Sequence, residues 1–311
     1  MKNVKTLSPF LLLLAAMLWG FAFAAQGAAS SLGAFTLGVA RNVIATLFLI
    51  PIIILFDKLS GGERRLISRR GIDINRTELV GGIICGAILT VASALQQFGI
   101  NDGTDAGKAG FITALYVVFV PIYALGLKKK APFNVWIAVA IATVGFYFLC
   151  ISDTLTVVPS DMLVLGAALL FPIHILAIDR FSPRCDGVRM SMIQFASAAT
   201  LNLALVFIFE PNAEIGQVFD SILPVLYLGI ASSGIAYTLQ IIGQRGVNPA
   251  AASVILSLES VFAVLGAAIF MGTTLSLREY IGCAIVFAAV ILAQLDIPEI
   301  LKSIGNKNRK K

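Results

Sequence analysis

Long apolar runs alternate with short polar segments along the whole chain, and this pattern predicts the elements. A helix rises ~1.5 Å per residue, so ~20 apolar residues cross a ~30 Å hydrocarbon core. Ten stretches of about this length are predicted to be helices: Pro9–Gly27, Ala34–Phe56, Leu79–Ile100, Ala106–Leu127, Phe133–Ile151, Met162–Ile178, Met190–Phe209, Ile222–Ile242, Pro249–Met271 and Leu277–Leu295. Little chain remains outside them, so the protein is expected to work inside a membrane.

The apolar runs lack the alternation of polar and apolar residues that marks the strands of a membrane barrel. PFLLLLAAMLW at 9–19 and IPIIILF at 50–56 are continuous. Since backbone groups in lipid must be satisfied internally, continuous runs favour helices. The expected fold class is an all-α polytopic membrane protein.

Composition excludes a soluble protein. Of the 311 residues, 58% are hydrophobic and only 13% are charged, whereas a soluble domain carries about 25% charged residues.

The positive charges lie almost entirely on one set of alternate loops. With the N-terminus placed inside, 20 of the 23 Lys and Arg residues fall in inside segments. The inside residues are Lys2, Lys5, Lys58, Arg64, Arg65, Arg69, Arg70, Arg76, Lys128, Lys129, Lys130, Arg180, Arg184, Arg189, Arg245, Lys302, Lys307, Arg309, Lys310 and Lys311. The outside loops carry mostly acids: Asp102, Asp105, Asp153, Asp161, Glu210, Glu214 and Asp220. This asymmetry predicts a multi-pass protein of the cell membrane with both termini in the cytoplasm, and its spread over short loops argues against nucleic acid as a partner.

The first helix has the look of a signal peptide, with Lys2 and Lys5 before an apolar core and then Ala22-Phe23-Ala24. Its removal would place the basic loops on the wrong side, so it is interpreted as a retained first helix. The four cysteines are scattered and have no metal-ligand spacing. No cofactor and no metal site is expected.

An internal repeat is indicated when the chain is shifted by about 143 residues. The matched pairs are Gln97 with Gln240, Gly103 with Gly246, Leu115 with Leu258 and Phe119 with Phe262. Identity is low, and coincidence between two apolar segments stays open. If the repeat is real, residues 1–155 and 156–311 each form a five-helix unit, the second inserted in the opposite sense and followed by a basic cytoplasmic tail. Inverted repeats of this kind place a binding site between them near the bilayer midplane, as in transporters.

The first helix carries Leu18-Trp19-Gly20-Phe21-Ala22-Phe23, which resembles the "WG" signature of EamA-type members of the drug/metabolite transporter superfamily. Arg41 stands where that family usually has an arginine early in its second helix. The resemblance covers the whole chain and implies ten helices in two inverted repeats and secondary transport of small metabolites, frequently export. The family's Gly-Glu pair after the fourth and ninth helices is absent here, where Gly126-Leu127-Lys128 and Gly272-Thr273-Thr274 stand.

Glu259 is the sharpest candidate site residue, because it lies about ten residues, or ~15 Å, into the ninth predicted helix. A carboxylate at the midplane is costly unless it faces a cavity or a partner. It could carry a coupled proton, act as the counter-ion of a cationic substrate, or be a protonated structural residue. Its counterpart in the repeat is Tyr116, so the two are expected to face each other across a cavity.

Five further residues are candidates for substrate binding or coupling: Trp19, Arg41, Gln97, His174 and Gln240. Trp19 could stack on substrate or pack on Gly20. Arg41 could bind a carboxylate or extend to the headgroups. His174 could handle protons or be a solvated residue near the interface. Gln97 and Gln240 are equivalent in the repeat.

Motifs for hydrolysis and ATP binding (HExxH, GxSxG and GxxxxGK[ST]) are absent from the sequence. Transport is therefore expected in place of catalysis. The resemblance implies secondary active transport, by alternating access, of a small metabolite such as an amino acid or a related amine or drug-like compound, in the export direction. A flippase for a lipid-linked or isoprenoid-linked substrate is the alternative, and a membrane enzyme is the weaker one. The expected partners are a small-molecule substrate and the lipid bilayer, with protons as a candidate coupling ion, and the chain is expected to be a monomer or a homodimer.

Overall fold

The computed structural model describes residues 2–59, 67–68, 71–72, 74–150, 158–271 and 276–295, and their fold is all-helical apart from one small hairpin. Nine helical segments of the described chain are long and apolar enough to cross a membrane, and the shorter apolar segment Phe133–Leu149 adds a tenth. The hairpin joins β1 (Ile67–Ser68) to β2 (Gly71–Ile72) in antiparallel register. The predicted fold class is confirmed.

The helical elements follow the predicted spans in order. They are α1 (Lys2–Ala28), α2 (Ala34–Leu59), α3 (Arg76–Asn101), α4 (Ala106–Ala114), α5 (Tyr116–Gly126), α6 (Phe133–Cys150), α7 (Asp161–Phe181), η1 (Ser182–Arg184), α8 (Gly187–Phe209), α9 (Ile215–Asp220), α10 (Ile222–Leu226), η2 (Tyr227–Tyr237), α11 (Thr238–Gly243), η3 (Gln244–Gly246), α12 (Pro249–Leu256), α13 (Glu259–Met271) and α14 (Leu277–Gln294).

Polar residues between the apolar runs start several helices. Asn75 accepts from the backbone of Thr77 and forms a capping box with Glu78 at the start of α3. The side chains of Asp105 and Asp186 accept from backbone amides in the first turns of α4 and α8. Such caps satisfy amide groups that the first turn of a helix leaves free. The starts of these helices are therefore determined by residues close to them in the sequence.

Two predicted spans are broken in the middle, and the breaks are equivalent in the repeat. The fourth span divides at Leu115 into α4 and α5, and the ninth divides after Leu256 into α12 and α13. Tyr116 and Glu259 are the first residues of the two second segments. The expectation that Glu259 lies within one continuous helix is thus wrong: a new helix begins at this residue.

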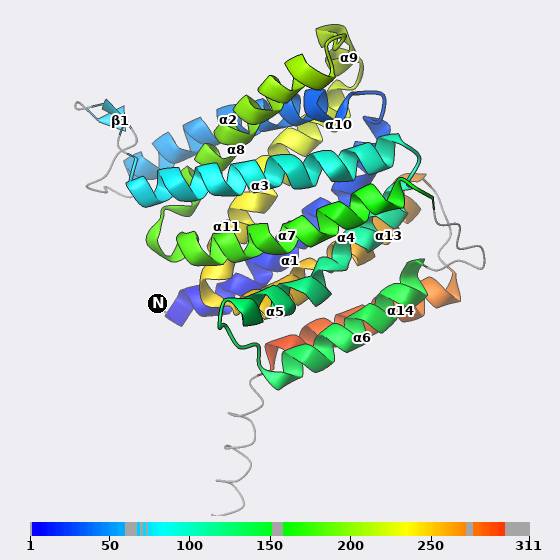
Figure 1. Ribbon diagram of the computed structural model, residues 1–311. Coiled ribbons are helices and arrows are strands. Elements are labelled where there is room, and N and C mark those ends of the chain that lie inside the picture. Colours follow the sequence, from blue (N-terminus) through cyan, green and yellow to red (C-terminus); the bar gives the residue numbers. More distant parts are fainter. Residues whose placement is uncertain are drawn as a thin grey trace, which may run out of the picture.

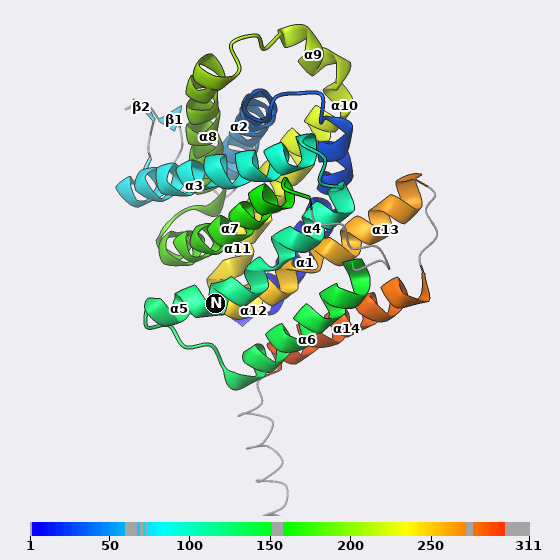
Figure 2. The ribbon, with the colours of Figure 1, turned by 45° about the vertical axis from the view of Figure 1, so that its right-hand side comes forward.

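Contacts between the helices repeat when the two halves of the chain are exchanged (Figure 1, Figure 2). The first helix packs on α12 and α13, and its counterpart α7 packs on α4 and α5. The third and eighth spans show the same correspondence. Helix α3 packs on α7 and α8, and its counterpart η2 packs on α1 and α2. Helices α2 and α8 pair with each other, as do α6 and α14. This is the arrangement of two inverted five-helix repeats. The predicted boundary at 155/156 lies outside the described residues and stays a prediction.

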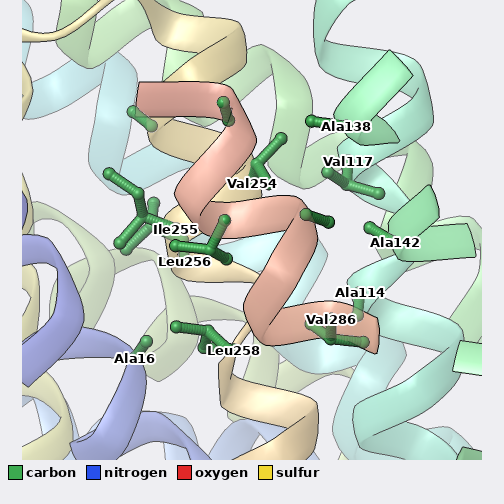
Figure 3. Packing of buried hydrophobic residues seen from close by; sticks show 14 of the residues in the cluster. Ala16, Ala114, Val117, Ala138, Ala142, Val254, Ile255, Leu256, Leu258 and Val286 are labelled. Carbon is green, nitrogen blue, oxygen red and sulfur yellow. The ribbon is translucent and has the colours of Figure 1, made fainter. Parts of the chain in front are cut away.

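The centre of the bundle is built around α12, all of whose residues are buried. Figure 3 shows its apolar side chains against Ala114 and Val117 of the fourth span, Ala138 of α6 and Val286 of α14. Small side chains at these contacts let the helix backbones approach closely, as is usual where lipid supplies no hydrophobic drive for helix association. Large apolar side chains are instead exposed around the outside, where acyl chains would cover them.

Gly20 marks the closest approach between α1 and α13. A Cβ added there would lie 2.3 Å from the Cβ of Phe262 and 2.7 Å from the backbone oxygen of Glu259. Both atoms belong to a packed helix and have little room to move. The glycine of the Trp-Gly pair is therefore required by packing beside the helix break.

We expect Gly20→Ala to destabilise the protein by about 1–3 kcal/mol, the usual cost of overpacking a filled interior. Thermal unfolding of the purified full-length protein in detergent measures this. The matched control is Gly126→Ala at the end of α5, where an added Cβ would meet nothing within 4 Å. Equal unfolding temperatures for the two variants would contradict the packing argument.

Candidate functional site

A cavity between the two repeats is lined by side chains from α1, α2, α3, α7, η2, α11 and both broken spans. Its empty volume, counting any part open to solvent, is about 520 Å³. Six of the seven residues predicted from sequence line it: Trp19, Arg41, Tyr116, His174, Gln240 and Glu259. The structure thus brings together residues from nearly every part of the chain.

Glu259 is almost completely enclosed, with 4% of its surface exposed. Its Oε1 has no hydrogen-bond partner among the described residues, and neither has the hydroxyl of Tyr116. The two side chains are neighbours, with the neutral phenol of Tyr116 beside the carboxyl group of Glu259. The helix breaks bring Tyr116 and Glu259 together, because each is the first residue of the second helix of its divided span. A buried carboxylate oxygen without a partner is ready to receive a proton or a cationic group.

Arg41 points into the cavity and does not extend to the headgroups. Only 8% of its surface is exposed, its Nε donates to Ser233 Oγ over 3.1 Å, and a terminal nitrogen donates to Ser232 Oγ over 3.2 Å. No carboxylate pairs with it in the described part of the chain. A buried guanidinium held only by neutral hydroxyls keeps its charge available to an anionic group.

The two serines belong to η2, an eleven-residue π-helix in the eighth span. Its repeat counterpart, α3, is a regular α-helix. A π-helix is wider than an α-helix and is rare in proteins. Where π-helices do occur, they are frequently found at functional sites. Here it presents two neighbouring hydroxyls to Arg41, and the backbone oxygen of Ser232 to Trp19. Gly229 and Gly234 let the side chains of α2 pack directly against this segment.

Trp19 forms an aromatic wall of the cavity. Its indole Nε1 donates to the oxygen of Ser232 over 3.1 Å, and its ring lies 4.5 Å from that of Tyr237 at 58°. Anchoring at both ends fixes the plane of the indole. The side chain also packs against two clusters of buried apolar residues, so packing and stacking on a substrate both stay interpretations of Trp19.

His174 is buried, with 1% exposed, and so is not the solvated interfacial residue that was one of its two interpretations. One ring nitrogen lies 3.0 Å from Gln194 Oε1, and the ring meets Tyr237 edge-on at 5.7 Å. Its position is set by one polar and one aromatic neighbour, and it contributes a polar surface to the cavity wall.

Gln97 is the predicted residue that lies elsewhere. It lines a smaller cavity beside Arg41 and Asn202, and its amide donates to the Gln26 backbone and to Asn101. The preceding residue, Gln96, lines the main cavity in its place and joins Gln26 to Thr113 through bonds of 3.0 and 2.8 Å. Gln240 does line the cavity, and its Oε1 has no partner among the described residues. Gln97 and Gln240 are therefore equivalent in the sequence repeat, but their surroundings in the structure differ.

The lining residues that sequence reasoning missed include Phe23, Ser93, Thr113, Phe171 and Ser232. Serine, threonine and phenylalanine are common in membrane helices, so nothing in the sequence separates these from packing residues. The Ser232-Ser233 pair beside glycine was the one visible signal.

Polar contacts between helices close the bundle at both ends. At the end where α1 finishes, Lys108 pairs with Asp161, and Glu210 accepts from the backbone amides of Phe35 and Thr36. At the other end Arg189 pairs with Asp57 over 2.9 Å, and Lys129 pairs with Asp179. Each contact joins the first half of the chain to the second, so these contacts hold the repeats together around the cavity.

Comparison with known proteins agrees with this architecture. The model of the EamA-like transporter family matches residues 6–151 and again 158–295. A protein of Archaeoglobus fulgidus named as an uncharacterized transporter is 28% identical over 288 residues, which span 92% of this chain and 85% of that protein. A solved crystal structure superimposes with a TM-score of 0.75 at 17% identity, over 95% of this chain and 99% of the other, and so shares the fold. With two matched copies that together span nearly the whole chain, the protein belongs to the EamA-like transporter family and is a multi-pass membrane transporter.

Proposed function

We propose that the protein is a secondary active transporter of the cell membrane that exports a small ionisable metabolite, an amino acid or a related amine, by alternating access. The cavity shared by the repeats is the substrate site. Rocking of one repeat against the other would open it to each side in turn. The contacts at the two ends, such as Arg189 with Asp57, would break alternately.

The observation that carries this proposal is the carboxylate of Glu259. It is buried at a helix break, inside a cavity built by both repeats, and one of its oxygens lacks a partner. Ionisable groups at membrane depth are costly and mark substrate or ion pathways. Broken helices at the repeat interface are where secondary transporters bind substrate and coupling ion.

Arg41 adds a second charge to the same cavity. A site with one acidic and one basic side chain from different helices suits a substrate that bears both an ammonium and a carboxylate group. The aromatic face of Trp19 would pack against the ammonium end or an apolar side chain.

Glu259→Gln tests the role of the carboxylate. With full-length protein in liposomes and a mixture of amino acids and amines read by mass spectrometry, we expect the variant to lose accumulation driven by a pH gradient. If Glu259 carries the proton, exchange of substrate for substrate persists. If it is the counter-ion, exchange falls as well, since binding itself weakens.

The control is Glu214→Gln, the same change at an exposed acid before α9. It should transport as the wild type does. Gradient-driven accumulation at wild-type rates in a well-folded Glu259→Gln variant would leave the carboxylate a structural role only.

Arg41→Gln tests the second charge. Affinity for a substrate with a carboxylate should fall about tenfold or more, the scale of a charged hydrogen bond worth ~1.5–3 kcal/mol. Affinity for the matching decarboxylated amine should stay near that of wild type. Competition of both compounds in the exchange assay measures the two values, and an equal loss for both would contradict carboxylate binding by Arg41.

The orientation is testable with reporter fusions. A fluorescent protein at the C-terminus should fluoresce, because both termini are proposed to be cytoplasmic. Alkaline phosphatase inserted after Asn212, in the exposed turn between α8 and α9, should be active. The same enzyme fused to the C-terminus should be inactive. Activity at the C-terminus would overturn the orientation.

A further inference from the structure

A basic pocket lies between α3 and α7, at the end of the bundle remote from Lys108 and Asp161. It is lined by Arg76, Thr77, Val80, Arg180, Phe181 and Arg184, and its empty volume, open parts included, is about 620 Å³. Three arginines thus converge on one pocket, two from the second repeat and one from the first.

None of the three arginines forms an ion pair with another described residue. The acids near them in sequence are engaged elsewhere. Glu78 accepts from the amides of Asn75 and Asp186, Asp179 pairs with Lys129, and Asp186 caps α8. Three like charges that line one pocket repel one another, and an anion between them would reduce that repulsion.

An apolar surface continues from the pocket toward the middle of the membrane. Val80 and Ile84 follow Arg76 at helical spacing on α3 and are 39% and 40% exposed. On α7, Ile173 lies about two turns from Arg180 and is 43% exposed. The two helices run side by side (Figure 1), and Gly81 brings α3 onto Phe181, with an added Cβ 2.9 Å from its Cβ. The pocket is therefore charged at its mouth and apolar below.

We propose that this pocket binds an anionic phospholipid. The phosphate would sit among Arg76, Arg180 and Arg184, since guanidinium groups bind phosphate oxygens in pairs. The acyl chains would lie along Val80, Ile84 and Ile173. Basic pockets between membrane helices on the cytoplasmic side suit anionic headgroups, and the apolar continuation favours a lipid over free phosphate.

Such a lipid would touch α3 of the first repeat and α7 of the second together. It would stabilise a contact between the halves at the end where Arg189 and Asp57 also meet. This inference concerns the outer surface of the bundle and does not depend on the substrate or on the role of Glu259.

Native mass spectrometry of the full-length protein in detergent tests the site, with phosphatidylglycerol and phosphatidylcholine as probes. Wild type should retain phosphatidylglycerol in preference to phosphatidylcholine. The triple variant R76Q/R180Q/R184Q should bind phosphatidylglycerol about tenfold or more weakly, because each basic residue adds to headgroup attraction. The matched control is K58Q/K128Q/K130Q, which removes the same charge from three exposed lysines on the same end of the molecule.

The proposal holds if the arginine variant loses the preference while the lysine variant keeps it within about twofold. Equal losses in the two variants would mean general attraction to a basic surface and would overturn it. So would undiminished binding in the arginine variant. Displacement of the lipid by millimolar inorganic phosphate would show that the pocket takes a free anion instead, and would also overturn it. Unfolding temperatures of both variants establish that they are folded, and single substitutions replace the triple variant if it is not.

Discussion

The structure depends on one constraint: a backbone amide or carbonyl in lipid must find its hydrogen-bond partner within the protein. The spans that face lipid meet this constraint as continuous helices. The two spans that are broken, at Leu115 and after Leu256, lie where other helices surround them, and α12 is buried along its whole length. Irregular backbone is tolerated in the centre of the bundle because protein surrounds it there. The same irregularity is what turns Tyr116 and Glu259 toward a cavity.

The repeats share a fold but have diverged in chemistry. Equivalent helix breaks present a hydroxyl in one half and a carboxylate in the other. The π-helical segment of the eighth span has no partner of its kind in α3, and it alone supplies the serines that hold Arg41. A symmetric scaffold therefore encloses an asymmetric cavity. An asymmetric substrate with a distinct polar head needs such a site, whereas the scaffold needs symmetry only to open in both directions.

The interior also shows how charge is kept inside a membrane protein. Paired ions such as Arg189 and Asp57 are near the ends of the helices, where water and headgroups reduce the cost of burial. Arg41 and Glu259 lie deeper, and neither forms an ion pair within the described part of the chain. Neutral hydroxyls and aromatic rings surround them instead. Ionisable groups that are buried without an oppositely charged partner are costly to folding, and a bound substrate or ion would relieve that cost.

The sequence by itself determined the number and order of the spans, the all-helical class and the caps that start the helices, because these depend on local composition and hydrogen bonding. It also identified Glu259, Arg41 and Trp19 as unusual at their depth. Only the tertiary structure decided that Gln96 and not Gln97 faces the main cavity, that His174 is buried, and that Ser93 and Ser232 belong to the lining. These depend on the rotation of each helix about its axis. That rotation is set by packing against distant helices, as where Gly20 meets Phe262, and local sequence carries no record of it.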